Sequence, residues 1–294
     1  MQDNLQLLFT ALQISSVYIL FSLGLTIIFG VLKVVNFAHG QFFTFGALVL
    51  SLVLRALAPS LGHGWAAYLL AGLAGLAGLA ACLFAGLVVY QFGFKRLERD
   101  MIGSFILSAG LVLLFEGIML EVFGGAVRPV PALLEGNVRL LGLTVSSQRL
   151  VLLAFAVLLT AAIIVLLQRT RFGKALRAVS IDHEAAMLQG VAYRQIALYG
   201  FLMATAVAAI AGMLIAPLAA VTPTLGDSYL VKGFIAVVVG GMGSIVGAIV
   251  GSVLIALLES FVGFYFDPSL ANLAIFVIVM VVLLVRPKGF FGND

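Results

Sequence analysis

The sequence predicts an all-α polytopic membrane protein with about eight transmembrane helices and one additional half-helix or re-entrant segment. Apolar residues make up 63% of the chain and charged residues 10%, with a mean hydropathy of +1.24. Soluble proteins carry about 25% charged residues, so this composition belongs in a bilayer. The charge-free runs are also long enough, at about 20 residues, to cross the hydrocarbon core. We therefore expect residues 1–294 to form a single transmembrane domain.

In chain order, the apolar runs predict spans at 5–32, 34–54, 66–94, 101–123, 150–168 and 196–221, an interrupted region at 230–266, and a last span at 270–285. Basic residues in short loops stay on the cytoplasmic side, and they cluster at 95–99, within 169–195 and at 286–288. The C-terminus is therefore expected in the cytoplasm and the N-terminus in the periplasm. The net charge of +4 comes from these clusters, so it orients the chain and does not indicate nucleic-acid binding.

This topology requires the interrupted region to cross twice or to re-enter the bilayer. Glycines between 240 and 247 would break a helix there, and irregular backbone at membrane depth needs protein or water partners. We expect a half-helix, a bend near 240–244 and then a full span. Elsewhere, Gly72, Gly75 and Gly78 recur at a spacing typical of close helix packing.

The longest soluble-looking stretch is the loop 169–195, which is basic at its start. Asp182 can cap a helix with Glu184 in its first turn, and Gly190 can follow its end. The pattern predicts a two-turn helix outside the bilayer. A basic amphipathic loop resting on anionic headgroups is the alternative interpretation. On the other side of the membrane, the loop 124–148 is long enough to shape an outer vestibule.

Polar residues at 36–41 interrupt the second apolar run. They predict either a broken helix that lines a translocation route, or a cytoplasmic connection in which Asn36 caps the next helix. Glu116 is expected in the outer half of the fourth span. It is either a functional carboxylate or an ordinary charged group that bonds a neighbouring helix or faces the vestibule. Glu259 and Asp267 are expected to be interfacial.

Sequence motifs for catalysis are missing. The chain has no HExxH, G-x-S-x-G or Walker A motif, so any ATP must bind another chain. With three histidines and the single Cys82, we predict no metal site, and we interpret His39 as a structural hydrogen-bonding residue. Cys82 can form no intrachain disulfide.

Four motifs then resemble a known family: Asn36–Gly40 (NFAHG), Arg171–Ala178 (RFGKALRA), Gly240–Gly247 (GGMGSIVG) and Arg286–Gly289 (RPKG). Together they resemble the permease subunits of ABC importers for branched-chain amino acids, specifically the H-type permease. The resemblance implies a multi-pass protein of the bacterial inner membrane that carries leucine, isoleucine or valine inward. It also implies a second homologous permease, two cytoplasmic ABC ATPases, and a periplasmic or lipid-anchored solute-binding protein.

ATP and Mg²⁺ would be held by the ATPases, and this chain would bind no cofactor itself. The resemblance makes the segment 169–195 the coupling loop, seated in a groove of the ATPase. The residues expected to couple to the ATPase are Arg171, Phe172, Gly173, Lys174, Ala175, Arg177, Asp182, Glu184, Ala185, Ala186 and Gly190.

The residues expected along the translocation path are Asn36, His39, Gly40, Gln41, Glu116, Gly240, Gly241, Gly243, Ser244 and Gly247. The family often has glutamate where Gln41 stands here. Similar permeases serve urea, short amides and other small solutes, so these substrates remain alternatives. An ion-coupled secondary transporter and a passive channel are further alternatives, separated from an ABC importer by the dependence of uptake on ATP.

Overall fold

The computed structural model describes residues 2–57, 65–98, 100–130, 136–140 and 143–292. Its long helices are α1 (Gln2–Leu32), α2 (His39–Leu57), α3 (Trp65–Phe92), α4 (Met101–Phe123), α5 (Ser147–Arg169), α8 (Tyr193–Ile215), α9 (Leu225–Gly240), α10 (Ile245–Tyr265) and α11 (Pro268–Val285). Its short elements are η2 (Phe94–Arg96), β1 (Asn137–Leu140), β2 (Leu143–Ser146), α6 (Arg171–Ile181) and α7 (His183–Leu188). Within the described residues, eight helices are long and apolar enough to span a membrane. The predicted fold class is therefore confirmed.

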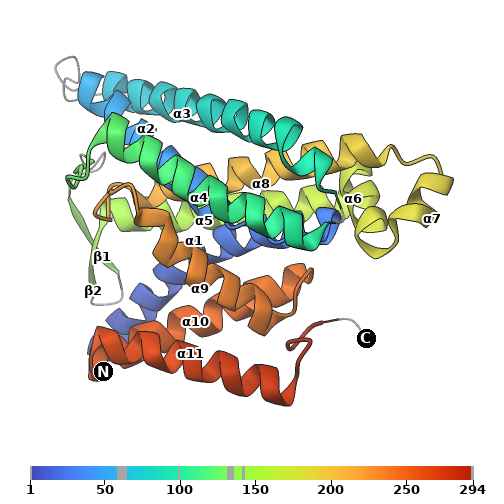
Figure 1. Cartoon of the computed structure of the whole chain (residues 1–294). Coiled ribbons are helices and arrows are strands. Elements are labelled where there is room, and N and C mark those ends of the chain that lie inside the picture. The colour runs from blue at the N-terminus through green and yellow to red at the C-terminus, as the bar shows by residue number, and fades with distance from the viewer. Residues whose placement is uncertain (1, 58–64, 99, 131–135, 141–142, 293–294) are drawn as a thin grey trace.

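The bundle has two distinct ends (Figure 1). The hairpin end holds the N-terminus and the antiparallel pair of β1 and β2, and it holds the Arg128–Val221 bridge between two connecting segments. The α7 end holds η2, α6, α7 and the turn between α9 and α10. Every long helix runs between these two ends or part of the way between them.

Helix α1 is the centre of the bundle. The most apolar window of α1 is 83% buried, whereas the corresponding windows of α4 and α11 are 11% buried. It packs against α10, α8, α9 and α5. A helix that is apolar on every side is stable when buried, and the outer helices turn similarly apolar faces outward, as a bilayer requires.

Helices α9 and α10 are antiparallel and are joined by the predicted bend. A Cβ atom on Gly240 would collide with the carbonyl oxygen of Gly247, so the two helices meet backbone to backbone. Gly241 and Gly243 have φ values of +106° and +88°, which favour glycine. The Ser244 hydroxyl then caps α10 by accepting a hydrogen bond from the Gly247 N–H at 3.0 Å. With 16 residues, α9 is not among the eight helices long enough to span a membrane, whereas the 21-residue α10 is, which agrees with the expected half-helix followed by a full span.

Glycines also bring α2 against α8 and α9. A Cβ on Gly226 of α9 would strike the carbonyl of Gly40, and one on Gly212 of α8 would strike the carbonyl of Phe43. In contrast, a Cβ on Gly72 or Gly75 of α3 would meet nothing within 4 Å, so the packing interpretation of the α3 glycines is wrong for these two. Only Gly78 of that series faces a neighbour, the Met213 side chain.

Some predicted boundaries need correction. The second span begins at His39, and the preceding residues 34–38 are not helical. The sixth ends at Ile215, and the following helix begins at Leu225, five residues earlier than predicted. Thr224 is the N-cap residue of this helix, but its side chain makes no capping hydrogen bond.

Candidate translocation path and coupling surface

The break between α1 and α2 returns the chain into the bundle. Lys33, with φ +54°, ends α1, and after a short irregular stretch a turn at Phe37 and Ala38 leads into α2. Phe21 lies eleven residues before the end of α1, a distance of about 16 Å along the helix. His39 at the start of α2 reaches this level, because its Nε2 lies 3.2 Å from the Phe21 carbonyl oxygen. The second span therefore begins inside the bundle.

The first turns of α2 and α9 meet at this depth. The Thr44 hydroxyl of α2 accepts a hydrogen bond from the Gly226 N–H of α9 at 2.8 Å, which satisfies one of the free N–H groups at the start of α9. The Gln41 side chain donates from Nε2 to Asp227 Oδ1 at 3.0 Å. Both helix N-termini carry partial positive charge, so a carboxylate beside them is stabilised.

Three polar side chains here are buried, and each has at least one polar atom without a hydrogen-bond partner. Asn36 is 1% exposed, and neither atom of its side-chain amide has a hydrogen-bond partner. The His39 Nε2–H donates to a carbonyl, which leaves Nδ1 as an unpaired acceptor, and Gln41 Oε1 is likewise unpaired. The interpretation of Asn36 as a side-chain cap is wrong. Unsatisfied buried amides are costly, which makes this cluster a candidate for contact with a polar solute.

Glu116 belongs to the same region. It is partly exposed on α4 and lies close enough to Asp227 for their carboxyl groups to interact electrostatically. Asp227, a residue that the sequence reasoning missed, is therefore hydrogen-bonded to Gln41 and lies within electrostatic range of Glu116. No charge pattern marked Asp227, because it lies between apolar runs.

The glycine turn at 240–247 lies at the α7 end. Gly243 is exposed, with nothing within 4 Å of a Cβ position, so its φ of +88° is what favours glycine there. Met242 from this turn lines a small cavity with Asn36. The C-terminal segment closes over the turn, since the Phe290 N–H donates to the Val239 carbonyl at 2.9 Å.

A second surface lies at the α7 end, on α6 and α7. The loop predicted before Asp182 is in fact the 11-residue helix α6, capped by the Thr170 hydroxyl, which accepts from the Gly173 N–H at 3.0 Å. A Cβ on Gly173 would collide with the carbonyl of Leu167, so α5 and α6 meet at a tight corner. Thr170 was the missed signal for this helix, because threonine is a good N-cap.

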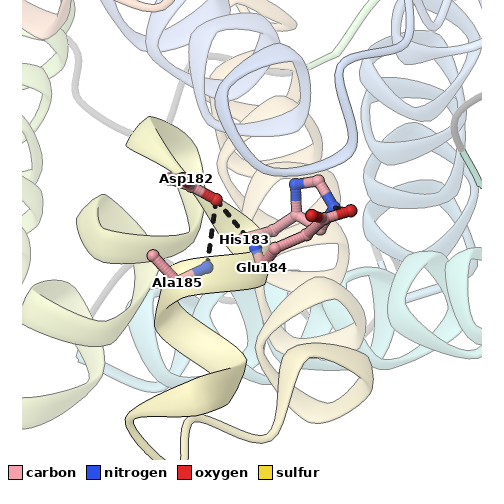
Figure 2. A network of polar contacts seen from close by, with 4 residues as sticks. All are labelled: Asp182, His183, Glu184 and Ala185. Carbon is pink, nitrogen blue, oxygen red and sulfur yellow. Dashed lines mark hydrogen bonds and ion pairs between the residues drawn. The ribbon is translucent and has the colours of Figure 1, made fainter.

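Helix α7 has the predicted caps. Asp182 Oδ1 accepts hydrogen bonds from the N–H groups of Glu184 at 2.9 Å and Ala185 at 3.0 Å, as Figure 2 shows. Gly190 follows the helix with φ +83°. Leu188 is 87% exposed and Ile181 82%, so the two helices present apolar side chains at the edge of the bundle.

The expected coupling residues divide into a buried and an exposed group. Gly173 and Ala186 are buried and hold α6 and α7 in place. Exposed side chains are those of Arg171, Lys174, Asp182, Glu184 and Ala185; Gly190 is exposed as well, and Phe172, Ala175 and Arg177 are half-buried.

Two acidic residues at the hairpin end were expected to be interfacial. Asp267 is exposed and caps α11, and the hydrogen bonds from Ser269 lower the pKa of its carboxyl group. Glu259 differs, because Lys232 Nζ donates to its Oε1 at 2.5 Å and Tyr18 donates to its Oε2 at 2.6 Å. Glu259 is therefore the half-buried ion-pair partner of Lys232 on α9.

A bundle with a broken helix inside it and a capped helical pair at one end defines a membrane permease, a transport component that crosses the bilayer many times. A family model described as "Branched-chain amino acid transport system / permease component" matches residues 7–285. The chain belongs to this family.

Relatives match along almost the whole chain. The permease protein BraD of the high-affinity branched-chain amino acid transport system of Pseudomonas aeruginosa is 26% identical, covering 98% of this chain and 96% of the relative. LivH of Escherichia coli K12, the permease protein of the corresponding system, is 25% identical with the same coverage. A solved ABC transporter, described as of the metal-chelate type and inward-facing, shares the fold with a TM-score of 0.50 and 16% identity, covering 96% of this chain and 85% of that one.

Proposed function

We propose that this chain is the permease subunit of an ATP-driven ABC importer that moves leucine, isoleucine or valine into the cell. The single observation that carries the proposal is the α6–α7 pair, two capped helices that project from a permease of this family. The inner membrane of a bacterium is the proposed location. The α7 end would face the cytoplasm, because basic residues gather there, and the N-terminus would face the periplasm.

The proposed partner of α6 and α7 is an ABC ATPase. Leu188 and Ile181 are almost fully exposed, and burying each in a groove would stabilise the complex by about 1.5–3 kcal/mol. Two such ATPases would hold ATP and Mg²⁺. A second homologous permease would complete the transmembrane part, and a periplasmic or lipid-anchored binding protein would deliver the solute at the hairpin end.

The proposed path passes the meeting point of α2 and α9. An amino acid has an ammonium group and a carboxylate, and this region offers opposite charge to both. Asp227 and Glu116 attract the ammonium group, and the helix N-termini beside Gly226 and Gly40 favour the carboxylate. The unpaired amide of Asn36 is a further contact for a solute moving toward the α7 end.

The test is uptake by the complete complex reconstituted in proteoliposomes. We expect ATP-dependent uptake of leucine against a gradient, blocked by vanadate and indifferent to a protonophore, and no comparable uptake of urea. Asp227→Asn should lower uptake per assembled complex by about tenfold, the effect of losing a hydrogen-bonded charge, with assembly unchanged. Uptake that persists without ATP would contradict the ABC assignment, and transport of urea alone would contradict the substrate.

A further inference from the structure

We propose that a cavity at the hairpin end, formed by α1, α9, α10 and α11, binds the transported amino acid as a zwitterion before it enters the path. The inference rests on the proposed function, because it takes leucine, isoleucine or valine as the solute. Its site is separate from the meeting point of α2 and α9, and its charged residues are Lys232 and Glu259.

The ion pair at this cavity is mostly buried. The side chain of Lys232 is 19% exposed and that of Glu259 is 22% exposed. Removing two charges from water is unfavourable, and an apolar pair of similar volume often stabilises a fold equally well or better. Ionisable residues at membrane depth also tend to be functional. The charges therefore indicate a role beyond holding α9 against α10.

The pair keeps hydrogen-bonding capacity that a ligand can use. The Lys232 ammonium group has three N–H donors, and the described residues take up one of them, through Glu259. Glu259 has one bond on each oxygen, from Lys232 and Tyr18, and each oxygen can accept a second. The carboxylate of a ligand can thus bind at Lys232 and its ammonium group at Glu259. Each charge of the ligand then lies beside the opposite charge of the pair.

The rest of the cavity suits an aliphatic amino acid. Its volume is about 600 Å³, inside the usual range of small-molecule sites. The apolar side chains of its lining include Leu7, Ile14 and Phe264. The amide and hydroxyl side chains are those of Gln6, Thr10 and Asn272, together with Ser260. An apolar body with a charge of each sign matches this combination, whereas a simple cation or anion would leave one partner of the pair unused.

The experiment measures binding of radiolabelled leucine to the purified complex of permeases and ATPases in phosphatidylglycerol nanodiscs, without nucleotide or binding protein. We expect saturable binding that isovalerate and isopentylamine, each lacking one charge, do not displace. Lys232→Met and Glu259→Gln should each weaken binding about tenfold or more, the loss of a charged hydrogen bond. Because either single variant leaves a buried charge unpaired, the double variant Lys232→Met, Glu259→Met provides a well-packed second test.

A steric pair of variants tests the cavity itself. Gly263 lines the cavity, and a Cβ there would come no closer than 3.9 Å to Ala271, so Gly263→Leu should fill space without breaking the helix contact. The matched control is Gly72→Leu on α3, where a Cβ would meet nothing within 4 Å. We expect Gly263→Leu to abolish leucine binding and Gly72→Leu to leave it unchanged.

Three outcomes would overturn the inference. One is leucine binding that is the same in the wild type and the double variant. Another is equal binding in Gly263→Leu and Gly72→Leu. The third is the replacement of bound leucine by phosphatidylethanolamine when that lipid is added, which would assign the cavity to a lipid headgroup. If the complex shows ATP-driven leucine uptake in any of these cases, only this inference fails, whereas absence of uptake refutes the proposed function.

Discussion

Replacing Gly190 tests the coupling role of α7 through the backbone alone. The residue has φ +83°, and a Cβ at this position would meet no heavy atom within 4 Å. A side chain therefore causes no clash, and its cost is conformational. The left-handed conformation costs a residue with a Cβ roughly 1–2 kcal/mol in conformational free energy, and more if the residue is β-branched. Asparagine is one of the non-glycine residues that tolerate this conformation best.

This conformational cost is large for α7, because the helix is only six residues long and the Asp182 cap holds only its other end. A cost of about 1.4 kcal/mol lowers the population of the native α7–α8 connection relative to alternatives by about tenfold. We expect Gly190→Val to lower the solute transported per ATP hydrolysed by several-fold, and Gly190→Asn to stay near the wild type. Insertion into the membrane should not change.

The assay is the ratio of leucine uptake to ATP hydrolysis in proteoliposomes, with the amount of assembled complex measured in parallel. Equal ratios for the Val and Asn variants would refute the reasoning, because the two side chains differ mainly in their tolerance of positive φ. A loss of assembled complex in both would show that the exposed side chain, and not the backbone, sets the contact with the ATPase.

Two further predictions concern packing and orientation. Gly226→Ala should greatly reduce the folded protein recovered from the membrane, because the new methyl group meets a carbonyl of α2, and Gly72→Ala should not; equal recovery would contradict the close contact. In a Cys82→Ala background, a cysteine replacing the exposed Arg139 should react with an impermeant thiol reagent in intact cells, whereas one replacing Leu188 should react only after permeabilisation; the reverse pattern would invert the proposed orientation.

Much of the fold followed from the sequence, because bilayer thickness imposes a length on apolar runs. The span 101–123 was predicted to the residue, and so was the Asp182 cap of α7. The return of 33–38 into the bundle was one of two interpretations, since an extended segment in the interior and a surface connection have the same local composition. Sequence spacing does not tell which neighbours a segment meets.

The site was predicted less completely for the same reason. Asn36, Gln41 and Glu116 were chosen because they interrupt apolar runs, but Asp227 joins them only through the packing of α9 against α2. The pair of Lys232 and Glu259 is separated by 27 positions and depends on the α9–α10 hairpin. A prediction from one sequence has no access to such long-range contacts.

The glycine contacts of α2 have a mechanical consequence. At Gly226 and Gly212 the main chains of neighbouring helices touch without an intervening side chain, so sliding α2 along α8 or α9 would drive carbonyl groups into Cα atoms. Close-packed surfaces of this kind resist gradual deformation. We therefore expect α2, α8 and α9 to move together as one unit. Because α8 follows α7 in the chain, a displacement of α7 by the proposed ATPase would be passed through α8 and α2 to the first turn of α9, which holds Asp227.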